Sequence, residues 1–356
     1  MVSSERSKQR WIPQSNPQSA TGKATQTIAR SLSVLVGTVA IATLSVLPSW
    51  AADPFRDTSP RDIDDQTELA FNAMFRDGNH QAARELLASP DATDPLAYAL
   101  GSAFSYLDED WDTLKSQYEK TLEAAAQMES SDPLRSHLYT AVGYFMEGGY
   151  IFSTEGSLTA VPKMVSKLSQ VLSNIRSAQA IDATDPELNL VKGYMDLLIA
   201  VNLPHADPET AIAQLEDYGR PEYLAKRGIA IAYRDLENHE KALEYVDAAI
   251  DLTPGNPDLL YLKGQILRNK ANDFSEETQQ DERQATLQES VNNFRRAFHM
   301  RAQMPEQLAA ELGFELCRAR DALRNRNRSR SDCRDWAAAR IAETPEPDTD
   351  ATESAS

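Results

Sequence analysis

The stretch Tyr223–Pro257, YLAKRGIAIAYRDLENHEKALEYVDAAIDLTPGNP, decides the fold. Its apolar residues recur at helical spacing in two blocks, which the polar run ENHE at 237–240 separates. Pro254 and Gly255 end the second block, because proline cannot continue the helical hydrogen-bond ladder. We therefore expect two helices that pack through these residues: Leu224, Ala225, Ile229, Ala232 and Tyr233 in the first, and Ala242, Tyr245, Val246, Ala249, Ile250 and Leu252 in the second.

The same stretch resembles the tetratricopeptide repeat (TPR) family, whose signature is a spaced set of small and large residues closed by a proline. Ala230 stands where the family usually has glycine. The resemblance implies an all-α fold, a TPR-like superhelix built from antiparallel helix pairs, in which the first helix of each pair lines the concave surface. The positions that match the signature are Tyr233, Ala242, Val246, Ala249 and Pro254.

Other parts of the chain repeat this design. The turn at 76–83 parallels the turn at 234–242 with one residue fewer. Two further helix starts combine a proline, which fits the first helical turn, with a glycine that lets a neighbouring helix approach: Pro186 with Gly193, and Pro257 with Gly264. Six or seven helix pairs are expected over residues 64–343, and the best repeat is 223–257.

Three irregularities are expected in this array. Gly148 and Gly149 predict a break after the helix that Pro133 opens, with the next helix spanning about 161–181. The polar run 272–281 predicts an insertion, after which the helix resumes at Ser290. A short final helix, Trp336–Ile341, is expected to cap the array.

The N-terminus has the order of a secretory signal. Residues 1–30 carry five basic residues against one acidic residue, and 31–47 is an uncharged, mostly apolar run before the small-residue pattern that ends at Ala51. Residues 1–51 are thus predicted to be a signal peptide cleaved after Ala51, which places the mature chain in a periplasm or outside the cell with no stable membrane anchor. The alternative is an uncleaved transmembrane anchor, since the run is nearly long enough to cross a bilayer.

Two segments outside the array carry no repeat pattern. Residues 52–63 are interpreted as a linker between the signal and the first helix. Residues 344–356, TPEPDTDATESAS, lack apolar periodicity and are predicted to be a disordered acidic tail.

The charge balance argues against a nucleic-acid binder. The chain has 36 lysines and arginines against 54 aspartates and glutamates, a formal net charge of −18. Neutralising phosphates supplies most of the affinity of general nucleic-acid binders, and an acidic protein lacks that term. With only 14 glycines and few β-branched runs after residue 52, the composition favours helices over sheets.

No sequence motif supports catalysis or a cofactor. None of the five histidines has metal-ligand spacing. His239-Glu240 begins like a zinc-protease motif, but Leu243 stands where that motif needs a second histidine. The chain is therefore interpreted as a binding protein, not an enzyme, without cofactor or metal.

A strip on the inner helices is the candidate partner site. On the TPR analogy, residues of two successive first helices project into the concave surface. Arginine forks pair well with carboxylates, so a protein or peptide partner with an acidic segment would fit. The alternative is surface charge that is paired within the chain. The residues of this inner strip are Arg227, Arg234, Tyr261, Gln265, Arg268 and Asn269.

Two other functions remain open. A periplasmic solute-binding accessory would hold an apolar or acidic small ligand in a helical cavity lined by Tyr144, Phe145, Tyr194 and Tyr261. An enzyme with a site built from distant residues is the third hypothesis. As a whole, the chain resembles the exported TPR proteins of unknown function found in cyanobacteria, which implies a scaffold that binds protein.

The two cysteines, Cys317 and Cys333, are predicted to form a disulfide. Both lie in the exported part, and an oxidising compartment makes pairing the default. The alternative is two separate thiols. A disulfide would close the basic loop 318–332 and dock the final helix.

Overall fold

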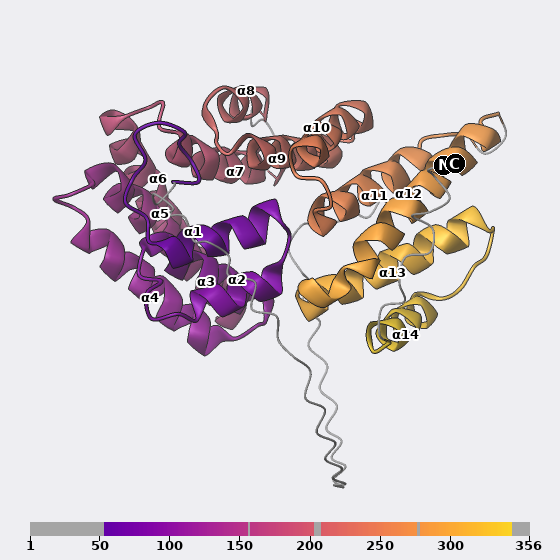
Figure 1. Cartoon of the computed structure of the whole chain (residues 1–356), viewed down its shortest axis with the longest axis horizontal. Coiled ribbons are helices and arrows are strands. Elements are labelled where there is room, and N and C mark those ends of the chain that lie inside the picture. The colour runs from indigo at the N-terminus through magenta and orange to yellow at the C-terminus, as the bar shows by residue number, and fades with distance from the viewer. Residues whose placement is uncertain (1–52, 156, 203–207, 276–277, 344–356) are drawn as a thin grey trace, which may run out of the picture. The chain divides into compact units, whose positions relative to one another are not determined.

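The computed structural model describes residues 53–155, 157–202, 208–275 and 278–343, and these form helices without any strand (Figure 1). The all-α prediction is thus confirmed. The predicted signal peptide and the predicted acidic tail lie outside the described residues.

The elements are α1 (Asp65–Phe71), the π-helical turn η1 (Asn72–Arg76), α2 (His80–Leu87), α3 (Pro95–Leu107), α4 (Trp111–Gln127), α5 (Pro133–Thr154), α6 (Ser157–Ile181), α7 (Pro186–Asn202), α8 (Pro208–Tyr218), α9 (Glu222–Asp235), α10 (His239–Leu252), α11 (Pro257–Ala271), α12 (Gln280–His299), the 3-10 turn η2 (Arg301–Gln303), α13 (Glu306–Leu323) and α14 (Arg330–Ile341).

Consecutive helices pack in pairs along the chain. α3 packs on α4, α5 on α6, α9 on α10, α11 on α12 and α13 on α14. The two helices predicted from the deciding stretch are α9 and α10, and their predicted apolar residues Ile229, Ala242 and Val246 are fully buried.

Helix starts are fixed by an acidic or amide cap followed by proline. Asp94 accepts a hydrogen bond from the backbone N–H of Leu96, and Asp132 accepts one from that of Arg135. Each cap satisfies a donor that the first helical turn leaves open, and proline lacks such a donor. The sequence therefore determines these boundaries locally.

Glycine allows close approach at two of the predicted positions. A Cβ on Gly264 of α11 would lie 2.5 Å from the ring of Phe294, and one on Gly193 of α7 would lie 2.7 Å from Leu215. Both glycines therefore admit a bulky side chain of the partner helix, as their spacing predicts.

The predicted break at Gly148 and Gly149 is wrong. α5 continues through both glycines to Thr154, and α6 begins at Ser157. α5 packs on both α4 and α6, and this packing holds the helix through the two glycines. Tertiary packing here overrides the weak helix propensity of glycine.

Two C-terminal helices begin earlier than predicted. α12 starts at Gln280, ten residues before Ser290, so the helix resumes within the polar run 272–281 that predicted the insertion. α14 starts at Arg330, because Ser329 and Asp332 form a reciprocal capping box there. The predicted basic loop 318–332 is correspondingly shorter, since α13 continues to Leu323.

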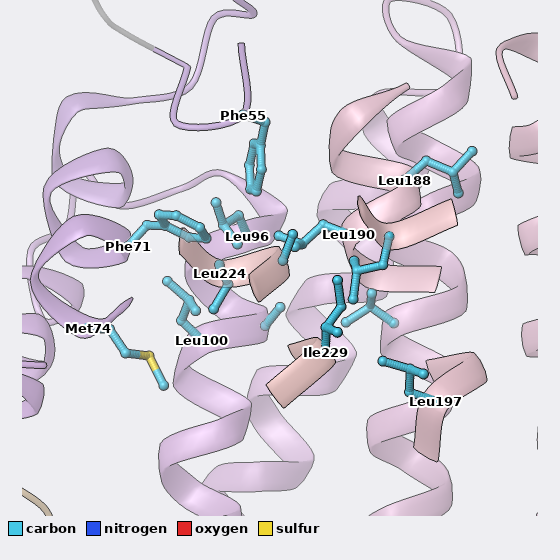
Figure 2. Packing of buried hydrophobic residues seen from close by; sticks show 14 of the residues in the cluster. Phe55, Phe71, Met74, Leu96, Leu100, Leu188, Leu190, Leu197, Leu224 and Ile229 are labelled. Atoms are coloured by element: carbon cyan, nitrogen blue, oxygen red, sulfur yellow. The ribbon is translucent and has the colours of Figure 1, made fainter. Parts of the chain in front are cut away.

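The segment predicted as a linker is packed where the structure describes it. Phe55 is 3% exposed and Ile63 is 1% exposed, and both belong to the main apolar core. Figure 2 shows Phe55 above Phe71 of α1, beside residues of α3, α7 and α9. Residues 53–63 therefore belong to the folded unit.

No helix in the described ranges is long and apolar enough to cross a membrane. The apolar run 31–47 lies outside those ranges.

A buried ion network joins the starts of three helices. Arg135 of α5 is fully buried and lies 2.8 Å from Asp94, which caps α3, and 3.0 Å from Glu187 of α7. Tyr139 donates to Glu187 at 2.6 Å, and burial raises the pKa of Tyr139 well above its ordinary value, so the hydroxyl keeps its proton. Burial opposes the charge of Arg135, but the carboxylates of Glu187 and Asp94 raise its pKa, so it stays charged.

The N-terminal segment extends this network. Arg61 lies 2.8 Å from Asp185, 2.8 Å from Glu187 and 2.9 Å from Asp132, and Arg56 also pairs with Asp185. Segment 53–63 therefore links the starts of α5 and α7 through charge as well as through its apolar side chains.

The disulfide is confirmed. Cys317 of α13 and Cys333 of α14 are bonded and fully buried beside Phe314 and Trp336. The bond docks α14 on the preceding helix, as predicted.

Replacing Arg135 with methionine should lower the free energy of unfolding by about 3–5 kcal/mol, because Asp94 would stay buried without its ion-pair partner and Glu187 would lose one of its two arginines. Urea unfolding at neutral pH measures this loss. The matched control, Arg176→Met, changes an exposed arginine of α6 and should shift the value by less than about 0.5 kcal/mol. Equal stabilities of the two variants would contradict a central role for the network.

The double variant Cys317→Ala, Cys333→Ala should be less stable than the oxidised protein by about 3 kcal/mol, since the bond closes a loop with a sequence separation of 16 residues. Peptide mapping without reductant should find the two cysteine peptides linked. The prediction fails if reductant leaves the unfolding curve of the wild-type chain unchanged.

Candidate functional site

The predicted inner strip lies on two neighbouring helices. Arg227 and Arg234 belong to α9, and Tyr261, Gln265, Arg268 and Asn269 belong to α11. α9 and α11 contact each other, so the first helices of successive pairs are adjacent, as the repeat analogy implies.

One end of the strip is occupied by the first helical hairpin of the chain. Nε2 of His80, at the start of α2, lies 3.0 Å from Asp258 Oδ2 of α11, and Arg227 lies 3.5 Å from the same oxygen. The Asn256 amide donates to the backbone oxygens of Phe75 and Arg76 at 2.9 and 3.1 Å. Residues about 180 positions apart in the sequence are thus held together.

The other arginines of the strip also have partners within the chain. Arg234 donates to Gln265 at 2.8 Å and lies 2.8 Å from Asp235. Arg268 pairs with the buried Glu315 of α13. This pairing is the alternative that the sequence left open, and the assignment of the strip to a partner stays a prediction.

The remaining two residues of the strip differ in burial. Tyr261 is 8% exposed and packs on Phe294, whereas Asn269 is half-buried. Neither side chain stands out from α11 as an anchor for a partner.

The contact with His80 stabilises the ionised form of Asp258. Burial opposes ionisation of Asp258, but the hydrogen bond and charge of His80, together with Arg227, outweigh it and lower the pKa of Asp258. Nδ1 of His80 and Oδ1 of Asp258 have no hydrogen-bond partner. The ring of His80 also faces Phe104 edge-on at 6.0 Å.

The arrangement of His80 and Asp258 fits a structural contact better than a catalytic dyad. Their exposures are 5% and 5%, so a substrate would not reach the ring. Among the described residues, one group of three metal-capable side chains lies close together, Cys317, Asp321 and Cys333, but its two cysteines are joined in the disulfide.

The aromatic residues of the predicted solute cavity lie in separate places. Tyr144 and Tyr194 pack against the main core, while Tyr261 belongs to the second cluster, and Phe145 is 39% exposed. A hollow of about 360 Å³ beside α2 and η2 is lined by none of them. Its lining is Asn79, Gln81, Ala82, Glu85, Met300, Ala302 and Gln303.

An exposed apolar stripe on α6 is the feature that sequence reasoning missed. Val161, Val165, Leu168 and Leu172 are 56%, 63%, 44% and 40% exposed. At 3.6 residues per turn these positions fall within an arc of about 60° on one side of the helix. Their spacing of four, three and four residues, next to the buried Val171, was the signal in the sequence, because one packing contact does not need so wide an apolar arc.

α6 packs less on the helix that follows it than several other second helices do. α4, α10 and α12 each pack on their own partner and also on the first helix of the next pair, α5, α11 and α13. α6 packs closely on α5 but makes few contacts with α7. The stripe is therefore an exposed side of a helix whose main packing partner is α5.

Two ion pairs lie on other sides of α6. Lys163 lies 2.6 Å from Glu155, and Lys167 lies 2.6 Å from Glu147 of α5. At 3.6 residues per turn both lysines stand about 130° or more from the middle of the stripe, so the stripe itself is an uncharged apolar patch, the kind of surface that marks interaction sites.

Comparison with known proteins gives no relative. No family model matches the chain, no curated protein is similar to it, and no solved structure matches it.

The variant Asp258→Asn should cost about 1–3 kcal/mol of unfolding free energy at pH 7, because it removes the carboxylate charge from the buried contact with His80 and Arg227. The folded-state pKa of Asp258 is lowered below 3.8, so its contribution is present above that pH and is lost as the pH falls through the folded value. Urea unfolding at neutral and acidic pH should therefore show that the free energy of unfolding falls less on acidification in the variant than in the wild type.

A matched control is Asp273→Asn. Asp273 pairs with His239 at 2.7 Å but is 59% exposed, so solvent screens the pair and the change should be small. Equal effects of the two substitutions would contradict a special role of the contact between α2 and α11.

Proposed function

We propose that the chain is an exported TPR-like scaffold that binds an amphipathic helix of another protein along α6. The observation that carries this proposal is the uncovered stripe of Val161, Val165, Leu168 and Leu172. Catalysis is not part of the proposed function.

The pairwise packing of α-helices supports the TPR-like superhelix. Helix pairs follow one another with capped starts, and glycines such as Gly264 admit the large residue of the partner helix. This agrees with the small-and-large pattern on which the resemblance in 223–257 rests.

The geometry of the stripe specifies the kind of partner. Because the stripe is exposed and runs along one side of α6, the occupant that fits it best is a helix lying along α6, with its own apolar residues three and four positions apart.

A lipid surface fits the same stripe less well. Amphipathic helices that bind membranes combine an apolar face with a basic polar face that meets anionic headgroups. Lys163 and Lys167 of α6 are paired with Glu155 and Glu147, so these lysines do not form a basic face for anionic headgroups. Their pairing favours a protein over a membrane.

Export to a periplasm or to the outside of the cell is supported by two features. The order of basic, apolar and small residues over 1–51 is typical of a cleaved signal. The disulfide between Cys317 and Cys333 suits an oxidising compartment. The resemblance to exported cyanobacterial TPR proteins agrees with both.

The variant Val165→Asp, Leu168→Asp should reduce partner binding at least tenfold, since buried charges would replace apolar contacts. A photo-crosslinker placed at Leu172 of the full chain, in the periplasm of its source, should attach to a helix with apolar residues three and four apart. Mass spectrometry identifies the crosslinked peptide.

The control Ser166→Asp, Ser169→Asp adds the same charge to exposed positions of the same helix and should leave binding intact. Unchanged crosslinking in the stripe variant would reject the stripe as the site. Crosslinks between two copies of this chain, lost in the same variant, would replace the proposed partner with self-association.

A further inference from the structure

Arginines are concentrated near the C-terminus of this acidic chain. Residues 318–340 contain eight arginines and three aspartates, whereas the whole chain has a formal net charge of −18. One aspartate of this stretch, Asp321, is buried and pairs with Arg328 at 2.6 Å. The local excess of positive charge is therefore carried by the other arginines.

Two of these arginines lie over one tryptophan ring, and a third follows one turn later. The guanidinium groups of Arg320 on α13 and Arg340 on α14 each lie 5.7 Å from the ring centre of Trp336. Arg324 follows one turn after Arg320 and is exposed at the end of α13. We call Arg320, Arg324 and Arg340 with Trp336 the arginine surface.

Arg320 is surrounded by other positively charged side chains. Burial lowers its pKa, and the neighbouring charges of Arg324, Arg295, Arg340 and Arg328 lower it further. Like charges held this close disfavour one another, and an anion placed among them relieves that repulsion. The arginine surface thus suits a segment that carries several carboxylates.

The described chain ends beside this surface. Arg301 donates to the backbone oxygen of Glu343 at 2.5 Å, and Arg340 lies 3.4 Å from the Glu343 carboxylate. The sequence after Glu343 carries four acidic residues and no lysine or arginine over 344–356. Thirteen residues can span at most about 45 Å when extended, which is ample to pass from Arg340 to Arg320 on the other side of one tryptophan ring.

We propose that the arginine surface is the docking site of the chain's own acidic segment 344–356. The carboxylates of Glu346, Asp348, Asp350 and Glu353 pair there with the guanidinium groups of Arg320, Arg324 and Arg340. This inference goes beyond the proposed function and is independent of it, because the surface belongs to α13 and α14 and not to α6.

Covalent attachment favours this segment over an acidic segment of another protein. A short tether gives the attached segment an effective concentration in the millimolar range. Weak, screened ion pairs are then enough to fill the surface, whereas a separate protein with the same contacts would need a comparable concentration.

Modification by phenylglyoxal, which reacts with free guanidinium groups, tests the docking in the full chain. The comparison is between the wild type and a tail-neutral variant, Glu346→Gln, Asp348→Asn, Asp350→Asn, Glu353→Gln. Peptide mapping by mass spectrometry should find Arg320, Arg324 and Arg340 modified at least threefold faster in the variant. Arg176, exposed on α6, should react equally in both proteins and serves as the internal control.

Added salt and an added peptide distinguish docking of the chain's own tail from binding of other acidic segments. In 0.5 M sodium chloride the wild-type rates should rise to those of the variant, because salt screens exposed pairs. A free peptide with the sequence of 344–356 should restore protection to the tail-neutral chain. Equal rates in the two proteins would overturn the proposal, and if the added peptide then protects both, the surface takes acidic segments from elsewhere.

Discussion

The arrangement of α3, α5 and α7 depends on an ion network around one buried cation. Arg135 joins the cap of α3 to Glu187 of α7, and Arg61 ties the preceding segment to the same carboxylate. A charge in the core is tolerated only when its partners are in place, so the network fixes where these helices start relative to one another. Its main effect is therefore on specificity of packing, because an equally large apolar side chain would not select these carboxylates.

The ion network holds the starts of α3, α5 and α7. The C-terminal parts of these helices are held by packing. α5 and α7 are held through Arg135 and Glu187, yet α6 makes few contacts with α7. The apolar side of α6 is exposed at this point of the stack. The strip on α9 and α11 differs, because His80 of the first hairpin reaches Asp258 and occupies one end of it. The arginines of that strip are thus paired within the chain, whereas the apolar stripe of α6 is exposed.

Charge is distributed unevenly along the folded chain. The N-terminal pairs use arginines to neutralise buried carboxylates such as Asp185 and Glu187, while arginines accumulate around Trp336 at the C-terminal end. A scaffold with an apolar site on α6 and a cationic site on α13 and α14 would keep two contacts of different chemistry on separate helices. The disulfide between Cys317 and Cys333 holds the cationic site in shape by fixing α14 on α13.

The sequence by itself determined the helical class, the pairing of α9 with α10, most helix starts and the disulfide, because these depend on spacing, caps and chemistry within a few turns. It did not determine that α5 would pass through Gly149, since the helix is held there by packing on α4 and α6. Nor did it reveal which arginines are paired. Arg227 meets Asp258, and His80 meets the same carboxylate from 178 residues away. Only the tertiary structure decided which apolar face stays exposed and which charges are neutralised, because both depend on neighbours that no local pattern specifies.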